Sequence, residues 1–172
     1  LIALMKDQVE NLKSKGIPAE AIYSGMTPRE VELAMNHVLH GQARFLYLSP
    51  ERLLTERFLT ALEHIKVGMI AVDEAHCISQ WGYDFRPPYL RIAEIRDRLP
   101  GVPVLALTAT ATRKVVKDIQ DKLRFQQYNV FERSFERNNL AYVVSRTENK
   151  PDRLLRICTN VKGSGIVYVR NR

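Results

Sequence analysis

The sequence predicts an α/β fold in which a parallel sheet is flanked by helices. Short apolar segments alternate with longer segments of helical periodicity along the 172 residues. The segment 68–72 is apolar throughout, which is typical of a strand buried inside a parallel sheet. Strand–helix–strand units of this kind form right-handed crossovers and a doubly wound sheet. The length suffices for one ordinary domain and part of a second.

The first half of the chain contains the clearest helix start. Thr27 can cap a helix, Pro28 suits its first position, and Glu30 follows three residues after the cap. This helix should end just before Gly41. In order, we expect a helix at 3–15, a strand at 18–23, a helix at 28–40, a strand at 44–48 and a helix at 51–65 that breaks near Thr55.

The second half continues the alternation of strands and helices. The segment 134–139 is polar and turn-prone, so we place a domain boundary there, between residues 1–134 and residues 135–172. The shorter part is too short to complete a sheet of its own. The expected elements are a strand at 68–72, a helix at 88–99, a strand at 102–107, a helix at 112–123, strands at 128–132 and 140–145, a helix at 151–161 and a strand at 165–169.

Composition places the chain among globular proteins, with 45% hydrophobic and 26% charged residues. No apolar run is long enough to span a membrane, so no membrane association is expected. The formal net charge of +7 is uneven: residues 1–112 carry 12 Lys/Arg and 13 Asp/Glu, whereas residues 113–172 carry 14 and 6. This excess favours a polyanionic partner, although a solvated basic helix face explains the charge equally well.

The two cysteines, Cys77 and Cys158, stand far apart without a CxxC spacing, and the four histidines show no metal-ligand pattern. We therefore expect neither a disulfide framework nor a zinc site. The reducing cytoplasm or nucleoid of a bacterium suits such a chain. Because the first residue is Leu1 and not Met, we expect the chain to be a piece of a longer protein.

Two acids, Asp73 and Glu74, directly follow the apolar segment 68–72. Ligands of open parallel sheets bind beyond the carboxyl ends of the strands, which makes this pair a candidate for nucleotide chemistry. Asp73 can hold Mg²⁺ directly or through water, and Glu74 can orient or deprotonate an attacking water. His76 is close enough to sense the phosphate end of a nucleotide. The alternative is that the acids only cap the next helix.

A loop at 78–89 is rich in aromatic residues. Aromatic faces stack on exposed bases, worth about 1–3 kcal/mol per base, and an arginine adds phosphate or cation–π contacts. The alternative is that Trp81 and Phe85 belong to the core, but their polar and proline-rich neighbours favour an exposed loop. The loop contains Trp81, Tyr83, Phe85, Arg86 and Tyr89.

Small hydroxyl residues follow the expected strand at 102–107. In a parallel sheet Thr108 and Thr110 would lie beside the end of the strand that precedes Asp73, where they can hydrogen-bond to the catalytic loop. A β-branched strand end with Thr112 as a helix cap explains the threonines equally well.

These motifs, in this order, resemble those of RecQ-family ATP-dependent DNA helicases in helicase superfamily 2. The most specific element is the aromatic-rich loop, which other DEAH-type helicases lack. The resemblance rests on residues 1–9 (motif Ia), 47–53 (motif Ib), 73–76 (motif II, Asp-Glu-Ala-His), 79–87 (the aromatic-rich loop), 107–111 (motif III), 135–140 (the join to a second RecA-like lobe) and 165–172 (motif IV).

The resemblance implies a P-loop-NTPase-type helicase fold, with most of the first RecA-like lobe in residues 1–134 and a linker and the start of the second in residues 135–172. It implies ATP as substrate, Mg²⁺ as cofactor, and single-stranded DNA and duplex junctions as partners, with protein partners left open. Asp73 would hold the metal, Glu74 would be the catalytic base, and His76 would complete the catalytic group. Residues that contact DNA or couple this contact to hydrolysis would be Ser49, Pro50, Arg52, Ser79, Gln80, Trp81, Phe85, Arg86, Thr108 and Thr110.

Parts of such a motor are missing from the sequence, which contains no Gly-Lys dipeptide and hence no Walker A loop. The chain also stops before the family's arginine finger. We therefore expect a parent protein that couples ATP hydrolysis to 3′–5′ translocation and unwinding in DNA repair and recombination, and an inactive isolated chain. The alternatives are a nucleic-acid-binding module on a degenerate helicase scaffold and a nucleotide-binding protein without a DNA role.

Overall fold

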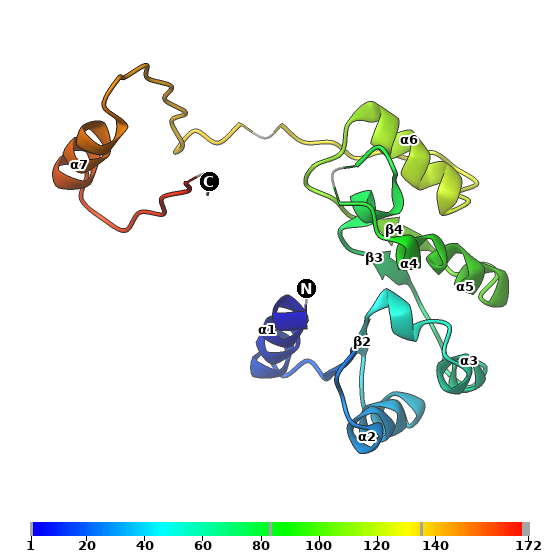
Figure 1. Ribbon diagram of the computed structural model, residues 1–172. Coiled ribbons are helices and arrows are strands. Elements are labelled where there is room, and N and C mark those ends of the chain that lie inside the picture. The colour runs from blue at the N-terminus through cyan, green and yellow to red at the C-terminus, as the bar shows by residue number, and fades with distance from the viewer. Residues whose placement is uncertain (1, 83, 135, 170–172) are drawn as a thin grey trace. The chain divides into compact units, whose positions relative to one another are not determined.

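The computed structural model describes residues 2–82, 84–134 and 136–169. It divides into two compact units, Leu1–Asn129 and Val130–Arg172, which we describe separately (Figure 1). The predicted motif positions Leu1, Tyr83, Phe135 and 170–172 lie outside the described residues.

The first unit alternates helices and short strands, as the sequence predicts. The elements around the first two strands are α1 (Ile2–Ser14), β1 (Ala19–Ile22), α2 (Pro28–Leu39), β2 (Phe45–Leu48), the 3₁₀ turn η1 (Pro50–Arg52) and α3 (Glu56–Leu62). Those around the other two are β3 (Ile70–Val72), the 3₁₀ turn η2 (Ala75–Ile78), α4 (Pro87–Leu90), α5 (Ile92–Arg98), β4 (Val104–Ala106) and α6 (Arg113–Lys122).

In the described part of the chain, four strands form two parallel pairs. In the first pair, β1 and β2 run side by side with Ala19 opposite Phe45. In the second, β3 and β4 are in register with Val72 opposite Ala106. The α/β class with parallel strands is confirmed, but the expectation of one continuous sheet is wrong for the described residues, where no strand joins β2 to β3. In doubly wound sheets the spatial order of strands differs from the chain order, so alternation alone does not specify neighbours.

Local sequence signals explain how the helices begin. The predicted capping box is present at α2, where the Thr27 backbone N–H donates to Glu30 Oε2 at 2.7 Å and the Glu30 N–H donates to Thr27 Oγ1 at 3.3 Å. The backbone hydrogen bond from Thr27 lowers the pKa of Glu30. The expected break near Thr55 is also present, because Thr55 stands at the N-cap of α3.

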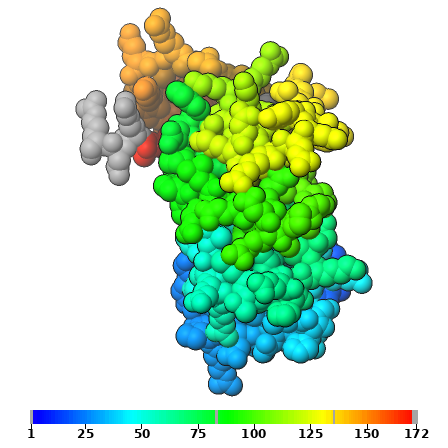
Figure 2. All heavy atoms as spheres, turned by 90° about the vertical axis from the view of Figure 1, so that its right-hand side faces the viewer, coloured from blue at the N-terminus to red at the C-terminus, as the bar shows by residue number. Residues whose placement is uncertain are grey.

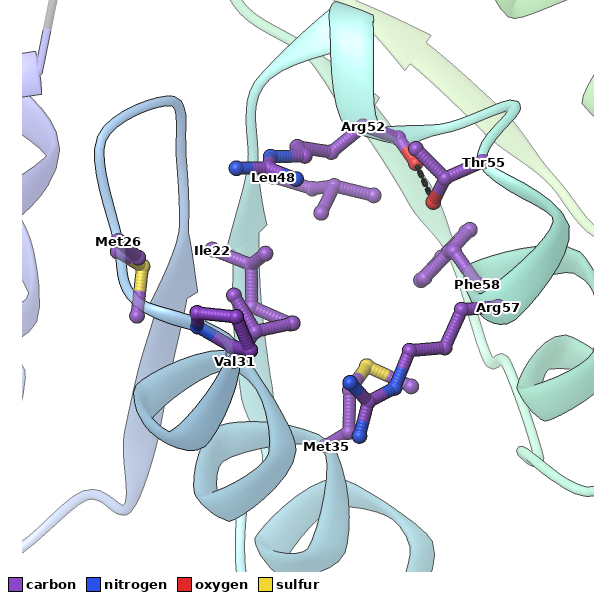
Figure 3. Close-up of a pocket in the computed structure, with 10 residues that line it drawn as sticks. Ile22, Met26, Val31, Met35, Leu48, Arg52, Thr55, Arg57 and Phe58 are labelled. Carbon is purple, nitrogen blue, oxygen red and sulfur yellow. Dashed lines mark hydrogen bonds between the residues drawn. The ribbon is translucent and has the colours of Figure 1, made fainter.

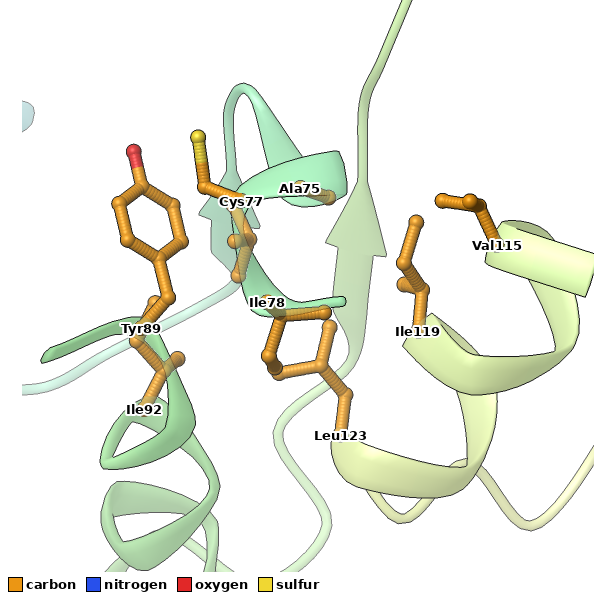
Figure 4. Close-up of a cluster of buried hydrophobic side chains, with 9 residues drawn as sticks. Ala75, Cys77, Ile78, Tyr89, Ile92, Val115, Ile119 and Leu123 are labelled. Atoms are coloured by element: carbon orange, nitrogen blue, oxygen red, sulfur yellow. The ribbon is translucent and has the colours of Figure 1, made fainter. Parts of the chain in front are cut away.

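Two apolar clusters hold the first unit together. One lies around η2, where Figure 4 shows Ile78 directed towards Leu123 at the end of α6, with Tyr89 and Ile92 on the other side of the turn. The other cluster lies between α2, α3 and α5. Ile70 on β3 packs against both clusters. The space-filling view shows the half with β1 and β2 (blue to cyan) packed directly on the half with β3 and β4 (green to yellow) (Figure 2).

The second unit contains one helix, α7 (Lys150–Asn160), among its described residues. The strands predicted at 128–132, 140–145 and 165–169 are absent, and these expectations were wrong for the described residues. A strand needs a neighbour for its backbone N–H and C=O groups, and none is paired here. The apolar side chains of these segments are exposed, up to 100% at Val144. No described helix of either unit is long and apolar enough to cross a bilayer.

Candidate functional site

The acid pair lies at the carboxyl end of β3. Val72 is buried at the end of the strand, Asp73 is exposed, and Glu74 adopts a left-handed backbone conformation (φ 49°, ψ 41°). The adjacent strand end fixes this turn, because Leu107 N–H donates to the Val72 carbonyl at 2.8 Å and Ala75 N–H donates to the Leu107 carbonyl at 2.9 Å. A left-handed non-glycine residue costs on the order of 1–3 kcal/mol and persists only where its surroundings enforce it.

The capping alternative does not describe this acid pair. Glu74 occupies the N-cap position of η2, but its side chain accepts no capping hydrogen bond. Instead, its Oε2 lies 3.2 Å from His76 Nδ1. Asp73 Oδ1 accepts the N–H of Glu74 at 2.9 Å, and no described cationic group lies in salt-bridge range of Asp73. An exposed carboxylate beyond a parallel strand fits a Mg²⁺ ion that takes its remaining ligands from water and phosphate.

His76 connects the two strand ends. Its side chain is 3% exposed, and Nδ1 lies 3.1 Å from Thr108 Oγ1 as well as 3.2 Å from Glu74 Oε2. The N–H of Thr110 donates to the same Thr108 hydroxyl at 3.2 Å. The expectation that the threonines beyond the second strand lie beside the acid pair is confirmed. The contact with Glu74 places a proton on His76 Nδ1, because a carboxylate can only accept a hydrogen bond.

The loop after η2 is tied back to it by polar contacts. Arg86 binds Asp84 with Nη2 2.6 Å from Oδ2, and the Arg86 backbone N–H donates to the Cys77 carbonyl at 2.8 Å. This ion pair holds the pKa of Asp84 below its usual range and raises the pKa of Arg86. Burial, helped by the Asp84 charge, raises the pKa of the Cys77 thiol to about 11. A Cβ on Gly82 would lie 2.8 Å from the His76 carbonyl oxygen, so this close approach requires glycine.

Trp81 presents its ring to solvent, as the loop interpretation predicts. It is 65% exposed, and Lys114 Nζ lies 3.1 Å from the ring centroid. Phe85 is half-buried, with Lys122 Nζ 5.9 Å from its ring centroid. Both lysines belong to α6, and Lys122 also donates to the Ile78 carbonyl at 3.4 Å. The loop and the basic face of α6 therefore form one surface, which we call the aromatic–lysine surface (Trp81, Phe85, Lys114, Lys122).

Two members of the loop take no direct part in such a surface. Ser79 is completely buried, and its Oγ accepts the backbone N–H of Trp81 at 3.2 Å, so its side chain connects η2 to the start of the loop. Tyr89 was expected among the stacking rings but is a 4% exposed core residue, and burial raises the pKa of its hydroxyl to about 12. Gln80 is exposed. The sequence analysis did not identify the contact of Lys122 with Phe85 or the ion pair of Asp84 with Arg86, because both depend on how the loop folds.

The residues Ser49, Pro50 and Arg52 follow the end of β2. Ser49 N–H donates to the Ile22 carbonyl at 3.1 Å, and Arg52 Nη2 donates to the Tyr23 carbonyl at 3.4 Å. Arg52 Nε is buried without a hydrogen-bond partner among the described residues. Pro50 starts η1.

Arg52 also lines an apolar cavity of about 320 Å³ that contains none of the acid pair, His76 or the aromatic loop. Figure 3 shows Arg52 and Arg57 at opposite ends of this cavity, which lies between β2, α2 and α3. Its other lining residues include Met26, Val31 and Phe58, so it offers little polar chemistry. Among the described residues, the arrangement suited to nucleotide chemistry is therefore at the end of β3 and not in the cavity.

Comparisons with known proteins identify helicase relatives of this chain. A sequence profile of the DEAD/DEAH box helicase family matches residues 1–119. The chain is 40% identical over 173 residues to the ATP-dependent DNA helicase RecQ of Pasteurella multocida and 43% identical over 175 residues to that of Bacillus subtilis. Both alignments cover 100% of this chain but only 27% and 29% of the relatives.

Among solved structures, the helicase domain of Pyrococcus furiosus Hef aligns with a TM-score of 0.48 and 21% identity, over 73% of this chain and 26% of that one. The chain thus spans between a quarter and a third of the length of the RecQ relatives it matches. On the family profile and on identity along its whole length, the chain belongs to the DEAD/DEAH box helicases, and its relatives there are RecQ helicases.

Proposed function

We propose that this chain forms part of the motor of an ATP-dependent 3′–5′ DNA helicase, which couples ATP hydrolysis to translocation on single-stranded DNA and to the unwinding of duplex junctions in repair and recombination. One observation carries the proposal. His76 contacts Glu74 at the end of β3 and Thr108 beyond β4, and its own turn continues into the loop that exposes Trp81. A residue that contacts DNA is thereby joined through a few covalent and polar links to the acid pair.

The proposed chemistry assigns a role to each residue at the strand end. Asp73 would hold Mg²⁺, which when bound neutralises charge on the phosphates of ATP. Glu74 takes a proton from the attacking water, and its contact with His76 fixes the direction of its carboxylate. Thr108, which accepts the Thr110 N–H, contacts the same ring nitrogen of His76, Nδ1, and helps to hold the ring in place. A change at any of these contacts alters the orientation of the Glu74 carboxylate.

The proposed DNA contact uses the aromatic–lysine surface. Trp81 offers an exposed face for a base, and Lys114 and Lys122 offer positive charge to the phosphates. Arg86, which holds Asp84 and the backbone of Cys77, transmits a displacement of the loop to η2 and so to His76. Gln80 is exposed beside Trp81, and Ser49, Pro50 and Arg52 would lie along the DNA path.

The domain organisation and the site of action are proposed with it. Residues 1–134 would be most of the first lobe of the motor, and residues 135–172 the linker and the opening of the second. The exposed apolar side chains of the second unit support this division, since segments of strand propensity form strands only where other segments pair with them. DNA as partner and a bacterial cytoplasm or nucleoid as location follow from the RecQ relatives and belong to the proposal.

The first experiment measures ATP hydrolysis by the whole protein with and without single-stranded DNA. Glu74→Gln should keep ATP binding and lose about 10²–10⁴-fold in turnover, because the amide cannot accept the proton. The same exchange at Glu132, an exposed acid of the second unit, is the control and should leave turnover within about twofold, because Glu132 is not among the residues assigned to the site. Turnover retained by Glu74→Gln would remove the base from the mechanism.

The second experiment separates a DNA motor from a protein that only binds nucleotides. Oligonucleotide binding should weaken steeply with salt, and Trp81→Ala together with Arg86→Ala should reduce it. Phe131→Ala, which removes a 94% exposed ring of the second unit, is the matched aromatic control. If the double variant binds DNA as tightly as the parent, the aromatic loop has no role in DNA binding.

A further inference from the structure

Three side chains with metal-binding atoms gather where η2 meets the aromatic loop. A ring nitrogen of His76, the sulfur of Cys77 and a carboxylate oxygen of Asp84 all lie within 4.8 Å of one another. His76 Nε2 is 3.8 Å from Cys77 Sγ, and this sulfur is 3.7 Å from Asp84 Oδ2. Among the described residues this is the one group of three or more such side chains with its ligand atoms so close together.

The spacing is near that of a tetrahedral metal site. Zinc binds sulfur at about 2.3 Å and nitrogen or oxygen at about 2.0–2.2 Å, which places neighbouring tetrahedral ligands about 3.5 Å apart. The two separations that involve Cys77 Sγ, 3.8 and 3.7 Å, exceed this by only a few tenths of an ångström. The third separation, between the ligand atoms of His76 and Asp84, is at most 4.8 Å, so Asp84 would move towards the ring on binding.

The His76 ring already has the orientation that a metal ligand needs. Its Nδ1 faces Glu74 Oε2 and Thr108 Oγ1, so the proton of the neutral ring is on Nδ1 and the Nε2 lone pair faces Cys77 Sγ. Metal-binding histidines usually donate their other ring N–H to a carboxylate or another acceptor, which fixes the ring and raises its basicity. Glu74 occupies that position here.

We propose that His76 Nε2, Cys77 Sγ and a carboxylate oxygen of Asp84 form a three-ligand site for a thiophilic divalent cation, foremost Zn²⁺. A water molecule would take the fourth position. On binding, the Cys77 thiol releases its proton to solvent and Asp84 yields one oxygen from Arg86 to the ion. The ion enters from the side of Asp84, whose side chain is 40% exposed, because His76 and Cys77 are buried.

The bound ion would fasten the aromatic loop to η2. Asp84 lies within the loop, whereas His76 and Cys77 belong to the turn beneath it, so one ion crosslinks both. Under the proposed function this crosslink restrains the movement by which DNA contact reaches Glu74, and zinc acts as an inhibitor of DNA stimulation.

The test uses Co²⁺, a spectroscopic substitute for Zn²⁺, added to this chain under reducing conditions. A cobalt–thiolate bond gives a charge-transfer band in the near ultraviolet, and tetrahedral cobalt gives intense visible bands. We expect one equivalent of Co²⁺ to produce both and Zn²⁺ to remove them. Cys77→Ser should abolish the charge-transfer band, whereas Cys158→Ser, at the exposed cysteine of α7, should leave the spectrum unchanged.

A second variant covers the case in which Cys77→Ser does not fold, as judged by circular dichroism. Asp84→Asn changes a surface carboxylate and should weaken Co²⁺ binding at least about tenfold. Absence of the bands at saturating Co²⁺, or an equal loss in Cys158→Ser, would overturn the site. Neither result bears on the proposed function, which is measured as DNA-stimulated ATP hydrolysis without added transition metal.

Discussion

Two consecutive segments of the chain, η2 with Ser79 and the loop at 80–86, differ in burial and in the contacts that hold them. Ile78 and Ser79 are 0% exposed, whereas Trp81, two residues later, is 65% exposed. The first segment is fixed by packing between α4 and α6. The described residues of the second are held by an ion pair, cation–π contacts of Trp81 and Phe85, and backbone hydrogen bonds. A buried turn and a loop held by weaker contacts meet within a few residues, as the proposed coupling between DNA contact and the acid pair requires.

The largest effect on stability is expected from substitutions in the buried segment formed by η2 and Ser79. Ile78→Ala removes a completely buried side chain between Tyr89 and Leu123, so it should lower the free energy of unfolding by about 2–5 kcal/mol. Urea denaturation followed by circular dichroism measures the change. Leu33→Ala in α2, where the side chain is 58% exposed, should cost less than about 1 kcal/mol. Equal losses of unfolding free energy in the two variants would show that the side chains of η2 are not part of a packed core.

A smaller effect on stability is expected at Gly82, where the loop approaches the backbone of η2. Gly82→Ala places a Cβ 2.8 Å from the His76 carbonyl oxygen, a backbone atom that cannot move aside alone. The cost should be about 1–3 kcal/mol, with a displaced loop. Gly68→Ala is the matched control, because its added Cβ would meet nothing within 4 Å. If Gly82→Ala and Gly68→Ala have the same unfolding temperature, the backbone at Gly82 does not lie in close contact with η2.

The stability of the fold should depend on pH through the buried thiol of Cys77 in η2. Folding raises the pKa of Cys77 from 9.0 to about 11, so the folded state holds a proton that the unfolded state loses. Stability from this group is complete below pH 9 and falls between pH 9 and 11. Tyr89, with its pKa raised from 10.0 to about 12, acts in the same direction at higher pH.

Urea unfolding at several pH values, with a chelator present, measures this slope. Cys77→Ser should flatten the decline that begins near pH 9, and Cys158→Ser should leave it unchanged, because that cysteine is exposed. A decline of the same size in the Cys77→Ser variant would assign the pH dependence to other groups.

The smallest effect on stability is expected at the tip of the loop. Trp81→Ala should change the free energy of unfolding by less than about 0.5 kcal/mol, since the ring is exposed and its contact with Lys114 is a surface cation–π pair. The same variant should lower the stimulation of ATP hydrolysis by DNA in the whole protein. A large loss of stability would place the ring in the core in solution.

Local signals in the sequence predicted those parts of the fold that depend on neighbouring residues. The capping box of Thr27 and Glu30 and the break before α3 are set by contacts within one helical turn. The approach of Thr108 to the acid pair was also predictable, since parallel strands bring their carboxyl ends to one edge.

Features set by distant partners could not be predicted. Ser79 resembles a ligand-binding residue in sequence, but the packing of η2 between two helices buries it. Tyr89 has the composition of a stacking ring, and only the position of α4 places it in the core. The segment 140–145 has strand propensity, yet a strand forms only where another chain segment completes its hydrogen bonds.

The left-handed backbone of Glu74 has a consequence for protein engineering. Glycine adopts this conformation without strain, so Glu74→Gly should relieve a local cost of about 1 kcal/mol while removing the carboxylate that faces His76. Under the proposed function, thermostability and turnover oppose each other at this position. A screen that selects only for resistance to heat would therefore yield variants that lack the proposed catalytic base.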